Sequence, residues 1–269
     1  MIKDKIIKKL SKLTKHKNIE IVERGNSAID SALSILPKSL LIPEEGGWIH
    51  YQKAPKHAGL KFEYVKCRDA KIDLDDLKRK LSTGDYSALL YHQPGGYFAK
   101  QDMKKIYHLC QEYNCLVIMD VSGSIGTKLC NGDYANIIIG SFGKWKLVPA
   151  EVSGFISTDN PPIWHELMRN LKILKDEEKL ELIYQKLSEL PERINFLEEK
   201  VNKVINDLSQ YEILNDKNFA SIVMVKYKDD EEKKEVIDYC KENKLDYVLC
   251  PKYIRLQDKA ISIEIKRLY

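Results

Sequence analysis

The sequence predicts an α/β protein: a mostly parallel open sheet with helices on both faces, followed by a small α+β C-terminal domain. Three observations lead to this fold class. Short, unbroken apolar runs recur along the first part of the chain, as in strands buried on both faces. Helical patterns lie between several of these runs, the alternation that is typical of an open parallel sheet. A charge-rich helical stretch then separates this region from a shorter segment with its own strand and helix patterns.

The apolar runs mark the expected strands of the main body, at residues 38–42, 62–65, 87–91, 115–119, 136–140 and 153–157. Apolar residues at helical spacing mark the expected helices between them: Ala28, Ile29, Ala32 and Leu33; Leu74, Leu77 and Leu81; Met103, Ile106, Tyr107 and Cys110. Asp73 and Asp102 are the expected N-caps of the second and third helices, because an aspartate side chain accepts hydrogen bonds from first-turn N–H groups. Ligands of such sheets bind beyond the carboxyl ends of the strands.

The remaining patterns divide the chain into four expected segments. These are an N-terminal basic helical arm (1–19), a large α/β domain (20–160), connecting helices (161–210) and a small α+β domain (211–269). Asn160-Pro161-Pro162 closes the large domain, and Pro191 interrupts the helical stretch that runs over 163–209. The small domain is expected to hold strands at 221–227, 246–250 and 260–266 and a helix at 230–243.

The arm carries Ile2, Ile6, Ile7 and Leu10 on one helical face, with lysines elsewhere. We expect it to cover the main body or a partner subunit; the alternative is a surface that attracts an anionic polymer or a membrane. The net charge of +4 is too small by itself to indicate a nucleic-acid-binding protein. No apolar stretch approaches the roughly 20 residues of a membrane helix, and no secretory signal opens the chain. Six cysteines without CxxC spacing indicate reduced thiols in a cytoplasmic protein rather than a metal site.

Asp120 and Lys146 are the most informative pair in the chain. Asp120 ends the apolar run 115–119, and Lys146 lies just past the run 136–140. A carboxylate at the end of one buried strand and an amine past the end of the next can face the same crevice. Pyridoxal phosphate enzymes need such a pair: an anion keeps the pyridine nitrogen protonated, and a lysine holds the aldehyde as a Schiff base. Lys144 competes with Lys146 for the covalent role.

Other expected strand ends carry residues suited to the same site. Gly25, Asn26 and Ser27 open a helix and suit a phosphate, although most such turns are plain N-caps. Trp48 can lie flat on an aromatic ligand or fill the core under its loop. Gln93 can donate into the crevice, unless Pro94-Gly95-Gly96 only dictates a turn. The Ser141 hydroxyl, five residues before Lys146, can bind the cofactor phosphate.

In chain order, these segments resemble the DegT/StrS aminotransferases, a branch of the fold-type I pyridoxal phosphate enzymes. The segment 25–33 resembles that family's phosphate-binding turn and helix, and Asp102-Met103 begins a similar Asp-Met-x-x-Ile helix. Asp120 with Gly126 matches the segment that holds the pyridine nitrogen. Ser141-Phe142, Lys146 and Gly154 match Ser-Phe-x-x-x-Lys and the glycine eight residues later, a spacing that favours Lys146 over Lys144.

The resemblance covers about 20–158 and makes this large domain the expected site of pyridoxal phosphate binding. It implies transamination of a sugar or related small metabolite, with small-molecule amino donor and acceptor, in a homodimer with active sites near the subunit interface. The chain departs from the family at Gly123, where members usually carry His or Gln, and in its abbreviated carboxyl domain.

Three alternatives remain open at the level of sequence. The first is another reaction on the same cofactor, by a desulfurase, lyase or decarboxylase; a desulfurase needs a mobile cysteine, for which Cys130 is the candidate. The second is a catalytically inactive fold-type I binding protein, which Gly123 favours and Asp120 with Lys146 opposes. The third is a nucleotide- or nucleic-acid-binding protein that uses the basic arm.

Overall fold

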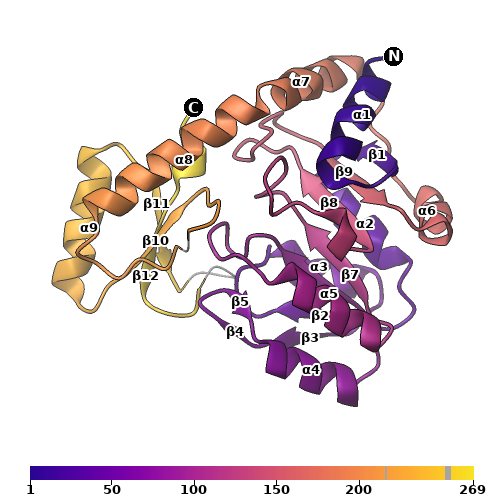
Figure 1. The fold of residues 1–269 in the computed structure, drawn as a ribbon, viewed down its shortest axis with the longest axis horizontal. Helices are drawn as coiled ribbons and strands as arrows, with labels where there is room; N and C mark the ends of the chain where they lie inside the picture. Colours follow the sequence, from indigo (N-terminus) through magenta and orange to yellow (C-terminus); the bar gives the residue numbers. More distant parts are fainter. Residues whose placement is uncertain (216, 252–255) are drawn as a thin grey trace.

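The computed structural model describes residues 1–215, 217–251 and 256–269. Its main body is a seven-stranded sheet in the order β1-β9-β8-β7-β6-β2-β3 (Figure 1). Strand β9 runs antiparallel to β1 and β8, and the pairs from β8 to β3 are parallel, so the expected open, mostly parallel sheet is confirmed. The strands are β1 (Asn18–Val22), β2 (Ser39–Pro43), β3 (Phe62–Val65), β6 (Tyr86–His92), β7 (Leu116–Asp120), β8 (Ile137–Ser141) and β9 (Gly154–Thr158).

Helices cover both faces of this sheet. One face carries α2 (Gly25–Ser34), α3 (His50–His57) and α6 (Pro161–Met168), whose apolar side chains form one core cluster with the sheet. The opposite face carries α1 (Ile2–Thr14), α4 (Leu74–Thr83), α5 (Met103–Glu112) and α7 (Glu177–Ser188) in a second cluster. The expected N-caps are confirmed: the Asp73 side chain accepts from the N–H groups of Asp75 and Asp76, and the Asp102 side chain accepts from that of Lys105.

The structure adds elements that the sequence patterns did not indicate. The search for apolar runs did not predict strand β1, because the polar residues Asn18 and Glu20 interrupt its apolar sequence. Glu20 is buried and is neutralised by Lys3 of α1, 2.7 Å away, which allows a carboxylate inside this edge strand. Helix α3 and the two-stranded hairpin of β4 (Cys67–Arg68) and β5 (Lys71–Ile72) were also missed.

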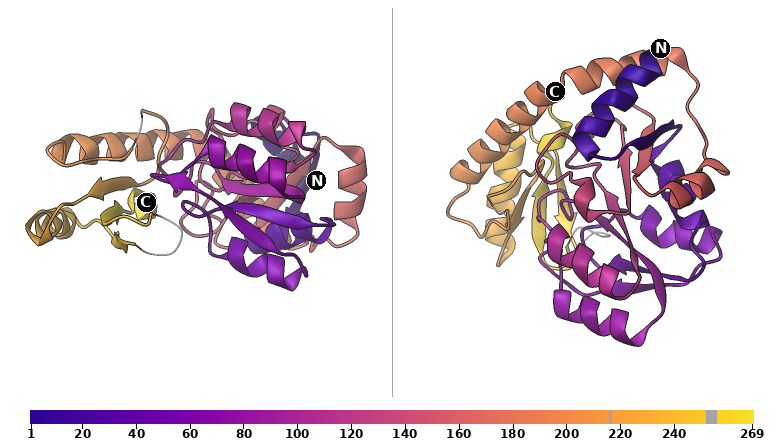
Figure 2. Two further views of the ribbon diagram at one scale, coloured as in Figure 1. Left: turned by 90° about the horizontal axis from the view of Figure 1, so that it is seen from below. Right: turned by 45° about the vertical axis from the view of Figure 1, so that its right-hand side comes forward.

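The N-terminal helix packs against the chain's own body. Ile6 and Leu10 are fully buried in the cluster that α1 shares with α7, and α1 lies beside α7 in both views (Figures 1 and 2). This matches the expectation of an arm that covers the main body. The lysines lie off the buried face, and Lys5 and Lys9 lie over the ring of Tyr184 in α7.

The connecting stretch is broken more than the sequence indicated. It forms α6, α7 and α8 (Leu190–Asp207), and the chain between α6 and α7 leaves the helical conformation, with a β-bridge between Ile173 and Val22. Pro191 lies in the first turn of α8, where its missing N–H costs no helical hydrogen bond. Figure 1 shows α8 reaching from the main body to the small domain. None of the helices in the described ranges is long and apolar enough to cross a membrane.

The small domain is a three-stranded antiparallel sheet in the order β10-β12-β11, with α9 (Asp230–Glu242) (Figure 2). Its strands are β10 (Val223–Lys226), β11 (Tyr247–Cys250) and β12 (Ala260–Ile263). Val225 and Ile261 face α8 and α9, whereas Met224 and Ala260 pack with Phe98 and Ala99 of the main body. The small domain thus presents one face of its sheet to the large domain, and residues that continue β12 meet the loops of the main sheet.

Candidate active site

A cavity of about 690 Å³ lies at the carboxyl ends of β6, β7 and β8. This volume falls within the range of small-molecule sites in proteins. His92, Asp120 and Ser141, the last residues of these three strands, all line it. Its walls come from both domains, because residues after β12 close the side opposite the sheet. The cavity is therefore where the topology of a parallel sheet places a ligand.

Asp120 is buried at the bottom of this cavity, with 5% of its surface exposed. Its Oδ1 accepts a hydrogen bond from the Ser122 N–H at 2.9 Å, and its Oδ2 accepts one from the Tyr51 hydroxyl at 2.7 Å. Burial and the neighbouring Asp120 charge raise the pKa of Tyr51 well above 10, so Tyr51 stays a neutral donor. Each carboxylate oxygen keeps a further lone pair, which is what a pyridinium N–H requires.

Lys146 reaches the same cavity from the loop after β8. Its amine donates a short hydrogen bond to the Tyr97 hydroxyl and lies 5.7 Å from the centre of the Trp48 ring. Lys144 also borders the cavity, but it is exposed and lies 5.9 Å from the ring of Trp145. The structure therefore brings Asp120 and Lys146 to one cavity, and it supports Lys146 over its neighbour as the inward amine.

Gly25 and Ser141 meet where a phosphate was expected. A Cβ on Gly25 would lie 2.6 Å from the Ser141 Cβ, and a Cβ on Gly154 would lie 2.9 Å from the Gly25 Cα. Only glycine permits this approach of α2 to β8 and β9. Helix α2 has no side-chain cap at its N-terminus, so its first-turn N–H groups are open to an anion. Gly25, Asn26 and Ser141 line the cavity here, beside Arg24.

Trp48 lines the cavity with 46% of its surface exposed. Its indole N–H donates to the Asn26 Oδ1 at 3.1 Å, which fixes the ring beside the open end of α2. The loop that carries it is held by Gly46, whose carbonyl accepts from the Gly96 N–H at 2.7 Å. Trp48 therefore lies at the carboxyl edge of the sheet with one side open to the cavity. It does not fill the core under its loop, which was the alternative.

Two of the expected site residues do not reach the cavity with their side chains. Gln93 is fully buried, and its amide both donates to and accepts from the backbone of Gln101, at 3.3 and 3.0 Å. The expectation that Gln93 points into the crevice is therefore corrected: its polar atoms secure the turn before α5. Ser27 lies in the first turn of α2 outside the cavity wall, so only its backbone N–H faces the open helix end.

Tyr97 occupies the space that Gly123 leaves free. A Cβ on Gly123 would lie 2.8 Å from Tyr97 Cδ1 and 3.2 Å from His92 Cε1. The rings of His92 and Tyr97 pack edge to face, with centroids 4.4 Å apart. The departure from the family pattern at this position thus has a local cause: a side chain at 123 would collide with two rings, that of His92 at the end of β6 and that of Tyr97 in the loop after it.

The small domain contributes charged residues that the sequence patterns did not single out. Glu264 and Lys266 are buried, form an ion pair, and line the cavity together with Arg267. The ammonium of Lys266 lies 4.8 Å from the centre of the Tyr97 ring, and the Arg267 guanidinium lies 4.5 Å from that of Trp145. The strand expected over 260–266 ends at Ile263, and Ile265–Arg267 form a 3₁₀ turn, so the alternation of Glu264 and Lys266 with apolar residues does not by itself predict where their side chains lie.

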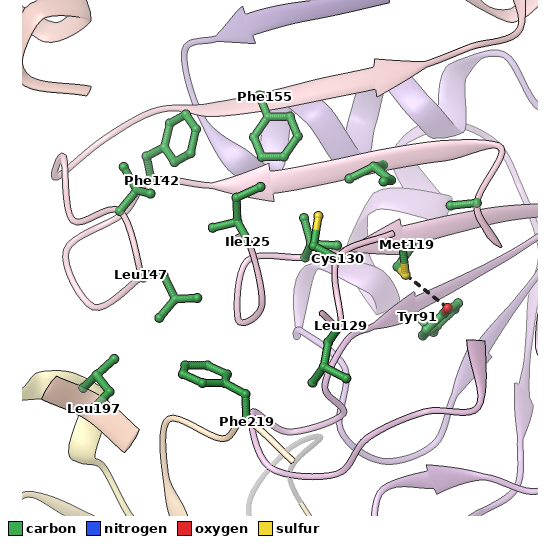
Figure 3. Packing of buried hydrophobic residues seen from close by; sticks show 14 of the residues in the cluster. Tyr91, Met119, Ile125, Leu129, Cys130, Phe142, Leu147, Phe155, Leu197 and Phe219 are labelled. Atoms are coloured by element: carbon green, nitrogen blue, oxygen red, sulfur yellow. Dashed lines mark hydrogen bonds between the residues drawn. The ribbon is translucent and has the colours of Figure 1, made fainter. Parts of the chain in front are cut away.

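Cys130, the candidate for a desulfurase, lies in the core. It is 6% exposed and packs beside Ile125, Leu129 and Phe155 (Figure 3). Burial raises the pKa of its thiol to about 12, which keeps it protonated near neutral pH. Within the described residues, the lining of the cavity contains no cysteine.

The sequence profile of a family described as aminotransferase class I and II matches residues 12–177. A search of curated protein sequences finds no significant match.

Many solved structures resemble the fold at low sequence identity. Helicobacter pylori PseC, an aminotransferase of pseudoaminic acid biosynthesis, is 12% identical with a TM-score of 0.81 over 98% of this chain and 85% of PseC. Bacillus subtilis NtdA, solved with bound PMP, is 14% identical with a TM-score of 0.77 over 98% and 72%. The histidinol-phosphate aminotransferase of Clostridium acetobutylicum is 17% identical with a TM-score of 0.72 over 98% and 84%.

Proposed function

The chain belongs to the aminotransferase class I and II family, a family of pyridoxal phosphate enzymes, and from this premise we propose that it transfers amino groups through Lys146. We assign the acceptor to sugars or related small metabolites, in the manner of the DegT/StrS branch. In this proposal the large domain, residues 20–160, binds the cofactor, and Lys146 holds its aldehyde as a Schiff base.

The observation that carries the proposal is the shared cavity of Asp120 and Lys146. A carboxylate that is 5% exposed is stabilised by hydrogen-bond donors, and Tyr51 and Ser122 use only part of its acceptor capacity. The uncapped end of α2 and the glycine contact at Ser141 leave room for a phosphate on the same cavity wall. These features fit a small aromatic ring that carries a phosphate at one end.

The residues of the cavity then divide the binding of the cofactor and the proton transfer among them. Asp120 accepts the hydrogen bond of the ring nitrogen and keeps that nitrogen protonated. Gly25, Asn26 and Ser27 bind phosphate oxygens through the first turn of α2, and the Ser141 hydroxyl adds a donor. Trp48 covers the ring and excludes water from it. Once an incoming amine has displaced it, Lys146 Nζ would move the proton between the substrate carbon and the cofactor. The bound cofactor supplies an electron-withdrawing ring for the charge that develops on that carbon.

The choice of a sugar-like acceptor is supported by the spacing of Ser141, Lys146 and Gly154, which resembles the DegT/StrS pattern. PseC, an aminotransferase involved in the biosynthesis of pseudoaminic acid, is among the solved structures that share this fold. A panel of nucleotide-linked keto sugars and of 2-oxo acids, each offered with L-glutamate, tests this choice. Turnover of 2-oxo acids alone would overturn it.

We also propose that the chain acts as a homodimer. Trp48, Trp145 and Val152 line the cavity and expose between 41% and 46% of their surfaces. Large apolar side chains gathered at one rim are suited to a protein interface. Light scattering of the purified protein tests the assembly, and Val152→Asp should shift it toward monomer. A monomer at micromolar concentration would contradict this part of the proposal.

Reduction with borohydride followed by peptide mapping is the direct test of the covalent role. We expect the label on Lys146, and we expect Lys146→Ala to lose both the label and the release of 2-oxoglutarate from L-glutamate. Lys144→Ala is the matched control, since it removes a neighbouring lysine of the same loop and should retain both. A label on residue 144 would overturn the assignment.

Two of the alternatives lose support in this geometry. A desulfurase that uses Cys130 would have to bring a buried thiol out of the core, and the described wall of the cavity contains no cysteine. An inactive binding protein leaves unexplained why a buried acid and an inward amine share one cavity. Sulfide release from L-cysteine, compared with 2-oxo acid formation from L-glutamate, separates the first alternative from transamination.

A further inference from the structure

We propose that Tyr97 is a positioning residue, whose hydroxyl holds the amine of Lys146 in the cavity. The inference rests on the proposed function, in which Lys146 is the covalent lysine. It assigns a role to a residue of the loop after β6, outside the segments that carry the family resemblance. The Lys146 amine donates to the Tyr97 hydroxyl and lies 4.8 Å from the centre of the Tyr97 ring.

A phenol hydroxyl is suited to this task by its hydrogen-bonding capacity. It offers one O–H donor and two acceptor lone pairs. It therefore accepts from Lys146 when the amine is an ammonium and donates to the amine when it is neutral. A lysine that takes up and releases a proton passes through both states, and a carboxylate at the same place could only accept and would favour the charged one. Tyr97 keeps the amine in place throughout such a cycle.

The backbone of Tyr97 is held in a conformation that residues other than glycine seldom adopt. Its φ is +76°, in the left-handed region, where a non-glycine residue needs support from its surroundings. That support is present on two sides: the Tyr97 N–H donates to the Pro94 carbonyl, and the Tyr97 carbonyl accepts from the Ser221 N–H, both at 3.1 Å. The second bond comes from the segment that leads into β10. Strain retained at a cavity wall points to a functional position.

The ring of Tyr97 is fixed from two further directions. Gly123 provides its space, because a Cβ there would lie 2.8 Å from the ring, and His92 packs edge to face against it. Lys266, paired with Glu264, lies over the ring at 4.8 Å from its centre. The small domain therefore contacts the residue that holds Lys146, and the position of the amine depends on both domains.

The test compares three variants. Tyr97→Phe removes the hydroxyl and keeps the ring. Gly123→Ala keeps the hydroxyl but displaces the ring, and it serves as a second route if the first variant folds poorly. Tyr211→Phe is the matched control, because it removes a hydroxyl bonded to Glu235 in the small domain, away from the cavity. Thermal unfolding identifies any variant that has lost its fold.

Two measurements are made on each protein. In the cofactor-free protein, trinitrobenzenesulfonate modifies lysines, and mass spectrometry gives the labelling of Lys146 relative to that of Lys144 in the same peptide. In the cofactor-loaded protein, stopped-flow absorbance gives the rate of the half-reaction with L-glutamate and with L-alanine. Loss of one hydrogen bond to a charged group corresponds to a change of about 10- to 150-fold.

We expect Tyr97→Phe to raise the Lys146 labelling ratio and to slow the half-reaction, each by about tenfold or more. Gly123→Ala should change both in the same direction, and Tyr211→Phe should change neither. A folded Tyr97→Phe protein with the wild-type labelling ratio would overturn the inference, whatever its activity. If borohydride labels Lys146 in the wild type, such a result refutes only the role of Tyr97. If it does not, the proposed function itself has failed.

Discussion

The bond between Tyr51 and Asp120 gives the sharpest stability prediction. Tyr51 comes from α3, an element the sequence patterns did not indicate, and it is 1% exposed. Its hydroxyl donates to the Asp120 Oδ2 at 2.7 Å. Tyr51→Phe removes one oxygen and keeps the ring, so the packing around α3 stays intact. The change isolates a neutral donor to a buried carboxylate.

The expected cost follows from the charge of the acceptor. A hydrogen bond to a charged group contributes about 1.5–3 kcal/mol to the free energy of unfolding, against about 1 kcal/mol for a neutral one. Tyr91 is the matched control: it is also fully buried, but its hydroxyl donates at 3.2 Å to the thioether sulfur of Met119, a weak acceptor (Figure 3). We expect Tyr91→Phe to cost about 1 kcal/mol or less.

Urea unfolding of the cofactor-free proteins near neutral pH, followed by circular dichroism, measures both costs. The comparison between variants matters more than either value, because both lose the same atom from a buried ring. Equal losses for the two variants, or a loss below about 0.5 kcal/mol for Tyr51→Phe, would show that the bond to Asp120 does not stabilise the fold.

Three further predictions address the phosphate turn, a buried histidine and the N-terminal helix. Gly25→Ala places a Cβ 2.6 Å from the Ser141 Cβ, so it should weaken cofactor binding by about tenfold or more in a spectroscopic titration. Ser27→Ala lies in the same turn but outside the cavity wall, and it should change cofactor binding little. Burial lowers the pKa of His16 below 6.5, so the unfolded chain binds a proton more readily than the folded one. The urea midpoint of unfolding should therefore fall as the pH drops below about 6.5, and His16→Gln should make that fall smaller. Ile6→Ala should lower the free energy of unfolding by about 2–5 kcal/mol, because Ile6 is fully buried against the main body, and a change near zero would mean that α1 does not dock in solution.

The parallel core could be predicted because its signal is local. A strand that is buried on both faces must be apolar throughout, so β2, β6, β7 and β8 appear in the sequence as unbroken runs. Their carboxyl ends meet at one edge of the sheet, which brought Asp120 and Ser141 into the expected site. Edge strand β1 gave no such run, since it contains Glu20, a buried carboxylate whose ion-pair partner, Lys3, lies seventeen positions earlier in the chain.

Side-chain direction within the loops could not be predicted in the same way. Gln93 and Tyr97 follow the same strand, yet Gln93 turns inward to Gln101 and Tyr97 turns to Lys146. The difference depends on the left-handed backbone at Tyr97 and on the space above Gly123, neither of which leaves a mark in a pattern of apolar residues.

Composition and apolar periodicity thus predicted the central strands of the sheet and which residues follow their carboxyl ends, because burial acts on each strand by itself. The wall opposite the sheet, with Glu264 and Lys266, was decided by how the small domain packs on the large one. Contacts of that kind join residues more than a hundred positions apart, and they depend on complementary shape and buried charge, which a linear pattern does not encode.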